Sequence, residues 1–386
     1  MTEPQGASSS RHFASPKIIA FPMHGYHKMV DEGFRTRDAH LIEWLAKFVE
    51  LEGTVEVLSR PEPKILDLPR RFSTNHRRTS NKLNLDDHSS TTWRLPHPTD
   101  RRRWWVDSAS HYDFPRASAG TPAVVWNPFV AVSNISHSVF NSQRRTIADL
   151  LDDWTVHYAF ARIRDQVEDA YRHLFSYVDH VTANSEGTAE LARRFGRSDV
   201  ELMTNGVDPE RFDATSAATG PMTVGYVGKI GHRLDLDLVC AAARLLSSVN
   251  FVFAGPILDS GYREPMERHP NITLLGDVHY EDVPALLRTF DIGWVPHRVG
   301  EFEIGGDILK TYEYRAAGLP VLTTPVRGAG KRGLAAVHVA DAQDHPRLLK
   351  EFAHSGPRVA RDSTPIPIEH TWEAKARHLY ALAGIS

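Results

Sequence analysis

The chain has 386 residues, of which 41% are hydrophobic and 24% are charged, and its net charge is −3. This length favours two domains of ordinary globular composition, and the slightly acidic charge balance argues against a nucleic-acid partner. The single cysteine excludes internal disulfide bonds, and no run of about 18 apolar residues predicts a membrane span. We therefore expect a cytoplasmic protein, with residues 1–15 as a polar, disordered tail.

Strand-like runs alternate with helical patterns along the first half of the chain, which is typical of parallel sheets flanked by helices. The expected strands are residues 17–21, 54–58, 123–126, 180–183 and 201–203, and the expected helices are 38–51, 156–175 and 186–195. Residues 70–113 show no period, and a loop of that length is usually functional or disordered.

The alternation resumes after a stretch of Ala, Thr and Ser at residues 213–220, which we interpret as a domain linker. The expected strands are 222–227, 251–254, 272–275, 291–296 and 321–322, and the expected helices are 234–246, 283–289 and 371–383, with one more beginning at Asp307. Two doubly wound α/β domains in tandem are the simplest account. Their predicted boundaries are 16–212 and 221–365, with 366–386 as a helix that packs back on the first domain.

The most informative segment lies in the second domain, where a glycine loop precedes a helix. The loop ends in Gly305 and Gly306, and the helix carries Asp307, Lys310 and Glu313 on one face. Glycine amides at a helix N-terminus bind anions, a lysine adds positive charge, and a glutamate one turn further on can accept from sugar hydroxyls. This order of groups predicts a nucleotide. A solvated charge paired with a neighbouring cation is the ordinary alternative for the glutamate.

A second cationic loop follows the first strand of the second domain and contains Gly228, Lys229 and Arg233. Glycine amides and two cations would suit a diphosphate, although any tight turn from a strand to a helix uses glycine. Asp235 and Asp237 come next and resemble an acidic metal-binding pair. Because they fall in the first turn of a helix, where carboxylates cap free amides, we predict no metal site.

Polar residues also follow strands of the first domain, where ligands of parallel sheets bind. His24 follows the first strand directly and is placed to contact a transferring sugar. Arg35 and Arg37 are placed to bind phosphate or an anionic acceptor. Asp153 stands beside Trp154, a pair that could bind sugar hydroxyls and stack on a pyranose; an acidic helix start with a core tryptophan is the alternative.

The segment from Arg70 to Trp105 is rich in arginine and ends in two tryptophans. Basic and aromatic residues together fit an anionic membrane surface or a polyanionic substrate. A peripheral contact with the inner face of the membrane and a merely solvated loop both remain open.

Several motifs together resemble glycosyltransferases of the GT-B fold, close to the family 4 type (glycosyltransferase group 1) that acts in bacterial surface polysaccharide assembly. The segments that carry the resemblance are 179–186, 205–212, 225–229, 310–314 with 318–321, Trp126 and 152–154. The resemblance covers residues 120–345 well and the first hundred residues poorly. It implies two Rossmann-like domains that face each other across a cleft.

The resemblance also implies roles for individual residues. Glu313 would hold the ribose of a nucleotide diphospho-sugar, which is the co-substrate in place of a cofactor. Gly228, Lys229, Arg233, Gly306 and Lys310 would bind the diphosphate.

One position departs from the family pattern, because the usual glutamate eight residues before Glu313 is Gly305 here. We expect Asp307 to contact the donor sugar instead, and we take His24 and Asp153 as the candidate catalytic residues.

The predicted reaction moves a sugar from a nucleotide diphospho-sugar to a hydroxyl of a glycan, a glycolipid or a small molecule. Cations and helix amides would stabilise the leaving diphosphate without a bound metal, and the resemblance implies retention at the anomeric carbon. A nucleotide-sugar 2-epimerase on the same fold is one alternative. A degenerate, non-catalytic glycan-binding or partner protein is another, because Gly305 replaces the glutamate.

Overall fold

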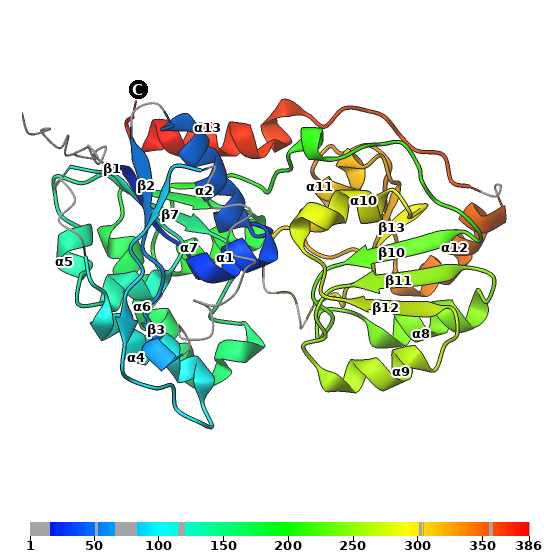
Figure 1. The fold of residues 1–386 in the computed structure, drawn as a ribbon, viewed down its shortest axis with the longest axis horizontal. Helices are drawn as coiled ribbons and strands as arrows, with labels where there is room; N and C mark the ends of the chain where they lie inside the picture. Colours follow the sequence, from blue (N-terminus) through cyan, green and yellow to red (C-terminus); the bar gives the residue numbers. More distant parts are fainter. Residues whose placement is uncertain are drawn as a thin grey trace, which may run out of the picture.

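The computed structural model describes residues 16–50, 53–65, 83–114, 120–300, 303, 305–354 and 358–385. Two lobes, each built on a parallel sheet with helices around it, lie side by side (Figure 1). The predicted tail at 1–15 and the arginines at 70, 71, 77 and 78 lie outside the described residues. The predicted fold class of two doubly wound α/β domains is confirmed.

The sheet of the first lobe has seven parallel strands in the order β4-β2-β1-β6-β7-β8-β9. Their bounds are β1 Pro16–Phe21, β2 Thr54–Val57, β4 Leu85–Asp87, β6 Ala123–Val125, β7 Thr146–Leu150, β8 His180–Ala183 and β9 Val200–Leu202. The sequence did not predict β7 or β4. Strand β7 is buried throughout but carries Asp149 among its apolar residues, and β4 is a polar edge strand, so neither shows the usual hydrophobic pattern.

Helices cover this sheet, and a small pair of strands lies beside it. The helices are α1 Tyr26–Glu32, α2 Arg37–Phe48, α4 Trp104–Asp107, α5 Ser136–Val139, α6 Arg164–Tyr177 and α7 Glu186–Arg194, and the small strands are β3 Glu62–Pro63 and β5 Thr91–Thr92. The helix predicted at 156–175 was placed too early, because residues Tyr158–Ile163 form a tighter 3-10 turn before α6.

The sheet of the second lobe has six parallel strands in the order β12-β11-β10-β13-β14-β15. Their bounds are β10 Thr223–Val227, β11 Asn250–Ala254, β12 Ile272–Gly276, β13 Ile292–Val295, β14 Val321–Thr323 and β15 Val337–Val339. The helices are α8 Leu236–Leu245, α9 Arg263–Glu267, α10 Val283–Leu287, α11 Leu309–Ala316 and α12 His345–His354. The sequence missed β15, α9 and α12.

The last helix, α13 Trp372–Leu382, crosses back and packs against α2 of the first lobe (Figure 1). Trp372 is fully buried in the core of the first lobe. Its ring stacks on that of His40, with the two ring centres 4.9 Å apart. The chain therefore connects the two lobes twice.

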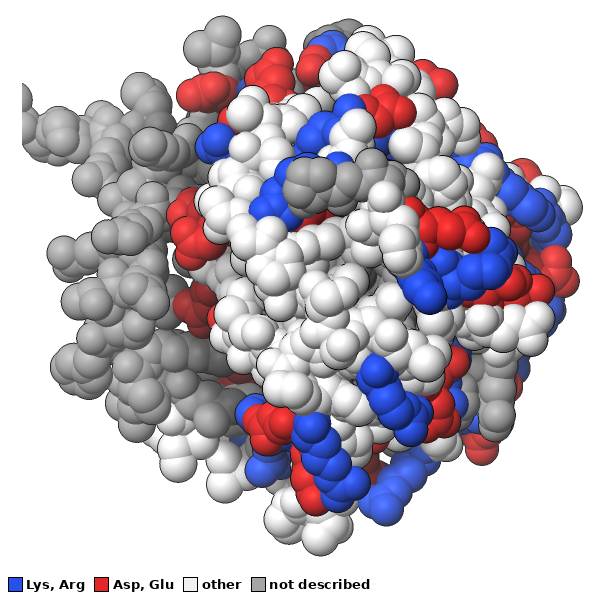
Figure 2. Space-filling view, turned by 90° about the vertical axis from the view of Figure 1, so that its right-hand side faces the viewer, with Lys and Arg blue, Asp and Glu red and all other residues white. Residues whose placement is uncertain are grey.

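Charged side chains of both signs are mixed on the surface of the second lobe (Figure 2). At the end of the molecule formed by the second lobe, basic and acidic side chains lie close together and no extended area has one sign (Figure 2). Among the described residues, no helix is long and apolar enough to cross a membrane.

Candidate functional site

The carboxyl end of β10 and helix α11 form the centre of the candidate site. Tyr314 of α11 accepts a hydrogen bond from the amide of Val227 at 2.7 Å, which fixes the helix against the end of the strand. Gly228 follows with φ of 151°, a conformation that favours glycine. A Cβ atom at this position would lie 3.0 Å from Cε of Lys310. Glycine thus allows the lysine to lie directly against the loop.

Lys310 and Glu313 are charged groups that form no ion pair with any residue the structure describes. The amine of Lys310 lies 5.1 Å from the ring centre of Tyr226, and burial, reinforced by the charge of Arg233, lowers the pKa of Lys310 to about 8. Glu313 is only 5% exposed, and its Oε1 atom has no hydrogen-bond partner among the described residues. Burial raises the pKa of Glu313 to about 7, although Tyr280 and Lys310 oppose this shift.

Other cations complete this region. Lys229 is exposed at the loop, and Arg233 donates to Oδ1 of Asp152 in the first lobe at 3.2 Å. The charge of Arg233 lowers the pKa of Lys310, and so does that of Lys229. The structure therefore brings Lys229, Arg233 and Lys310 together around Gly228, as the sequence predicted for a diphosphate site.

His297 lies beside these cations and was not predicted. Its Nε2 atom is 3.3 Å from the hydroxyl of Tyr226. Burial, with the charges of Lys310 and Arg233, holds the pKa of His297 well below its ordinary value, so the ring is neutral. It adds no positive charge to the site.

The glycines before α11 have a structural role that was not predicted, in addition to the anion binding that remains a prediction. Helix α11 begins at Leu309, two residues after Asp307, and the preceding loop packs on the first lobe. A Cβ atom on Gly306 would lie 2.1 Å from Oδ1 of Asp152, and one on Gly187 would lie 2.7 Å from Cα of Gly305. Contact between the lobes, and not only anion binding, therefore requires these glycines.

Asp307 is part of a polar network, so its predicted contact with the donor sugar is not supported. Its Oδ2 atom accepts from the hydroxyl of Tyr312 at 2.6 Å and from the amide of Asn205 at 3.0 Å, while Oδ1 accepts from Arg332 at 3.2 Å. Both oxygens are in use, and the side chain is 5% exposed.

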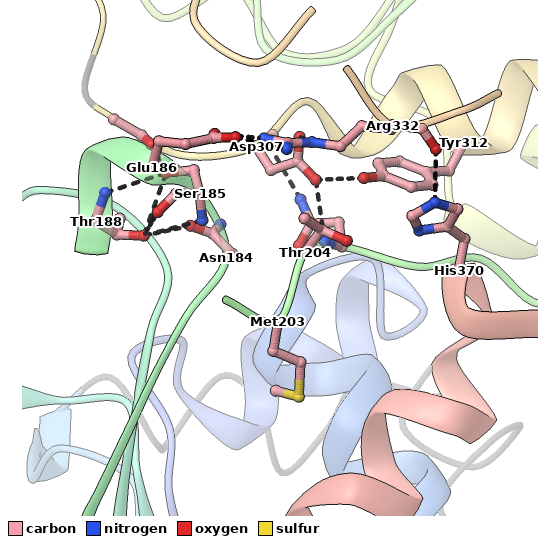
Figure 3. Close-up of polar contacts among 12 residues, drawn as sticks. Asn184, Ser185, Glu186, Thr188, Met203, Thr204, Asp307, Tyr312, Arg332 and His370 are labelled. Atoms are coloured by element: carbon pink, nitrogen blue, oxygen red, sulfur yellow. Dashed lines mark hydrogen bonds and ion pairs between the residues drawn. The ribbon is translucent and has the colours of Figure 1, made fainter. Parts of the chain in front are cut away.

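The same network joins the two lobes (Figure 3). Arg332 extends from the second lobe and donates to both carboxylate oxygens of Glu186, at 2.9 and 2.7 Å. Glu186 is the first residue of α7 in the first lobe. We name Glu186, Asn205, Asp307, Tyr312 and Arg332 the domain lock. Close by, Ser185 donates to the carbonyl of Gly305.

His24 lies at the carboxyl end of β1 and pairs with a buried carboxylate. Its Nδ1 atom is 3.0 and 3.1 Å from the two oxygens of Asp38, and its amide donates to Oδ2 of the same residue at 2.9 Å. Burial raises the pKa of Asp38, but His24 and a hydrogen bond from Thr36 outweigh burial and bring it down to about 2. Burial raises the pKa of Asp152, and Arg233, Lys229 and His24 all oppose this shift, so His24 faces the same interdomain region as Arg233.

Three other predicted residues are engaged in structural contacts. Asp153 accepts from Arg194 at 2.6 Å and from Thr155, so its neighbour Asp152 is the carboxylate that faces the second lobe. This argues against Asp153 as a catalytic group.

The two arginines predicted for an anionic acceptor are paired as well. Arg37 is 4% exposed and donates to both oxygens of Asp149 at 2.9 Å and to backbone carbonyls. Arg35 pairs with Glu32 and, across the lobes, with Asp277 at 2.6 Å. The core position of Arg37 leaves it no accessible donor, which corrects the prediction.

The acidic residues after the cationic loop cap a helix. Asp235 is the N-cap of α8 and accepts from the amide of Leu238 at 3.1 Å, in agreement with the sequence interpretation. No group of three or more potential metal ligands occurs among the residues that the structure describes.

Sequence reasoning did not identify the domain lock or the partner of His24. Glu186 and Arg332 are 146 positions apart, and nothing in the local pattern of either residue indicates the other. Asp38 did carry a signal, because it stands in the first turn of α2, the first long helix after the strand-end histidine, but a carboxylate at that position is ordinarily a helix cap.

Comparisons with known proteins agree with this site. Residues 221–351, which contain Lys229, Lys310 and Glu313, match the family described as Glycosyl transferases group 1. A region of 197 residues is 26% identical to TuaH of Bacillus subtilis (strain 168), a protein assigned by name to teichuronic acid biosynthesis as a glycosyltransferase. The match covers 47% of this chain and 49% of that protein, so the chain spans about half the length of this relative.

Solved structures share the fold over nearly the whole chain. HepE of Anabaena in complex with UDP and glucose has a TM-score of 0.59 at 14% identity, with 96% of this chain and 97% of that chain covered. An α,α-trehalose 6-phosphate synthase from Burkholderia multivorans has a TM-score of 0.57 at 13% identity, with 96% and 95% covered. These findings confirm the GT-B fold class and the predicted resemblance to family 4-like glycosyltransferases.

Proposed function

We propose that this chain is a glycosyltransferase that moves a sugar from a nucleotide diphospho-sugar to a hydroxyl group of a glycan or a glycan precursor. One observation carries the proposal: Lys310 and Glu313 are shielded from water, form no ion pair with a described residue, and lie next to a glycine loop with two further cations. The family match over the same residues supports it, and so does the complex of a structural neighbour with UDP and glucose. The comparisons favour a transferase over a 2-epimerase or a non-catalytic partner.

The chemistry follows from the positions of these groups. Lys229, Arg233 and Lys310 would neutralise the charge that develops on the leaving diphosphate, and the poor solvation of Lys310 makes its charge more effective. Glu313 would accept hydrogen bonds from the ribose hydroxyls. These three cations would stabilise the leaving diphosphate in place of a metal ion, so we propose a metal-independent reaction.

His24 is the group best placed to meet a sugar hydroxyl. Asp38 holds its Nδ1 atom, so Nε2 is the nitrogen directed to a substrate. Contacts between the lobes would exclude water from the donor and limit its hydrolysis. Retention at the anomeric carbon, which the family resemblance implies, is part of the proposal.

We also propose a peripheral contact with an anionic membrane through the exposed tip of the first lobe. Trp93, Leu95 and Ile65 are 78%, 63% and 55% exposed, and the amine of Lys64 lies 5.1 Å from the Trp93 ring. Arg94 is exposed between the two apolar side chains. Apolar and basic residues in this arrangement bind the interface of anionic lipids. Cosedimentation with anionic but not neutral vesicles, reduced in Trp93→Ser, is the expected result.

A thermal-shift panel tests the central proposal. UDP, GDP, ADP and dTDP, each with and without an attached sugar, are added to the full chain, and at least one is expected to raise the melting temperature. Protein with none of these ligands is the reference. Stabilisation by none of the eight would refute the donor site. Incubation of the stabilising nucleotide sugar with metal chelator and a glycan acceptor, followed by NMR of the anomeric proton, then checks metal independence and retention.

A further inference from the structure

Arg60 is a cation of the first lobe that forms no ion pair with an acidic side chain of the described residues. It lies three residues beyond the end of β2, and its Cζ atom is 3.9 Å from the ring centre of Trp105. Its Nε atom is buried and has no hydrogen-bond partner among the described residues. Burial lowers the pKa of Arg60, while Tyr112 and Glu62 oppose this shift from beyond ion-pair distance. An arginine that is shielded from water but unpaired is unusual in a folded protein.

Arg102 lies near Arg60, and it too forms no ion pair within the part of the chain that the structure describes. Its charge contributes to the lowered pKa of Arg60, and its Cζ atom is 5.7 Å from the ring centre of Phe160. The rings of Phe160 and Trp105 are themselves 5.7 Å apart. The two arginines thus lie on one aromatic cluster.

This cluster continues to the donor loop of the second lobe. The ring centres of Phe160 and His157 are 5.9 Å apart. The ring centres of Tyr158 and His232, the neighbour of Arg233, are 4.8 Å apart. The charges of Arg233, Arg102 and Lys229 all help to lower the pKa of His157, after burial. Two groups of cations, one on each lobe, therefore face the same interdomain region.

The surroundings of Arg60 are polar and lie where a substrate could approach. Next to it, Ser59 lines a cavity of about 10 Å³, the size of one water molecule, together with Ser89, Ser90 and Glu62. The three serine hydroxyls are hydrogen-bonded within the protein, so the cavity itself is no sugar pocket. It lies beyond the carboxyl ends of β1, β2 and β4, where ligands of parallel sheets bind, and this places Arg60 on the ligand-binding edge of the sheet.

We propose that Arg60 and Arg102 form an anion-binding subsite for the acceptor, so that the acceptor carries a carboxylate or a phosphate group near the hydroxyl that is glycosylated. The inference rests on the proposed function and adds the chemical class of the second substrate. Guanidinium groups bind both anions through charge-assisted hydrogen bonds, and a desolvated position strengthens those bonds.

The test compares three simple sugars as probes of the full chain. D-glucuronate, D-glucose 6-phosphate and D-glucose are titrated by ligand-observed NMR into wild type, Arg60→Gln, Arg102→Gln and the control Arg164→Gln, which removes an equal charge from an exposed position on the same lobe. At least one charged sugar is expected to bind wild type about 10-fold more tightly than glucose. Arg60→Gln and Arg102→Gln lose this preference, and Arg164→Gln retains it. The stronger of the two charged sugars identifies the anion.

Two outcomes would overturn the proposal: equal binding of charged and neutral sugars to wild type, or a full preference for the charged sugar in a folded Arg102→Gln protein. All four proteins have the same donor loop, so any anion binding there is common to them. A difference in affinity for the charged sugar between the variants and wild type therefore reports the contribution of the substituted arginine. Arg102 is exposed, which keeps the test valid if Arg60→Gln fails to fold. The nucleotide panel run on the same proteins separates this failure from a failure of the proposed function.

Discussion

The donor residues of α11 and the domain lock show two opposite uses of buried charge within a few residues. Asp307 and Arg332 are both buried, and each of their charged groups has a partner. Glu313 and Lys310 are shielded to a similar degree, yet no described residue forms an ion pair with either of them. A buried charge with partners holds the structure together, whereas one without partners lowers stability and is retained for a ligand.

Removal of a paired charge from the lock should have the largest effect. Arg332→Met leaves Glu186 and the buried Asp307 uncompensated, and we expect a loss of about 3 to 5 kcal/mol of unfolding free energy. Urea unfolding followed by circular dichroism measures the change as a lower midpoint for the transition. Arg347→Met is the matched control, because Arg347 is 59% exposed and its ion pairs contribute little. Equal midpoints for the two variants would show that the lock does not stabilise the protein.

The carboxylate of Glu313 should make the protein less stable as the pH rises, so its removal should stabilise the protein, in contrast to the removal of Arg332. The folded protein raises the pKa of Glu313 from 4.5 to about 7, so folding favours the protonated form. This favourable contribution is complete below pH 4.5 and is lost as the pH rises through about 7. Glu313→Gln has no such titration, so it should be more stable than wild type by about 2 to 3 kcal/mol above pH 7 and by little at pH 4.5.

Melting temperatures of both proteins measured at several pH values check this prediction. Glu281→Gln, on an exposed surface position, is the control and should give a difference from wild type that changes little over the same range. A Glu313→Gln protein that melts below wild type at pH 8 would contradict an unpaired, buried carboxylate.

Nucleotide affinity provides the third comparison. Lys310→Met keeps the length of the side chain but removes the charge, and a lost charge-assisted hydrogen bond to a phosphate should weaken binding about 10- to 100-fold. Because no residue in the described ranges forms an ion pair with Lys310, the same change should leave the melting temperature unchanged or raise it. Calorimetric titration with the nucleotide that gives the largest thermal shift measures the affinity, and the exposed Lys350→Met is the control. A Lys310→Met protein with a lower melting temperature and unchanged nucleotide affinity would show that Lys310 has a structural role and does not bind the nucleotide.

The sequence could predict the donor side because its signals are local. Gly228, Lys229 and Arg233 share one loop, and Lys310 and Glu313 share one turn of a helix, so short-range spacing indicates both groups. The alternation of strands and helices also predicts two parallel sheets, because most strands are apolar runs with glycine nearby.

The sequence could not separate Asp307 from Glu313, because both are carboxylates on the same charged segment. Only the structure shows that Arg332, twenty-five positions away, occupies the first and leaves the second unpaired. For the same reason the acceptor side was poorly predicted. Arg37 begins helix α2 and Arg60 closely follows strand β2, and the pairing of Arg37 with Asp149 depends on a strand, β7, whose pattern was not visible.

An exposed contact between the lobes should give the smallest effect. Arg35 in the first lobe and Asp277 in the second form an ion pair of 2.6 Å, with side chains 18% and 49% exposed. Water screens such a pair, so Asp277→Asn should cost no more than about 1 kcal/mol, and high salt should remove the difference from wild type. Melting temperatures at low and high salt measure it, with Asp341→Asn as an exposed control within the second lobe. A loss of stability in Asp277→Asn as large as that in Arg332→Met would mean that the ion pair of Arg35 with Asp277 stabilises the contact between the lobes as much as the domain lock does. A small loss that disappears in salt would leave the lock as the principal polar connection, because its buried groups are screened far less.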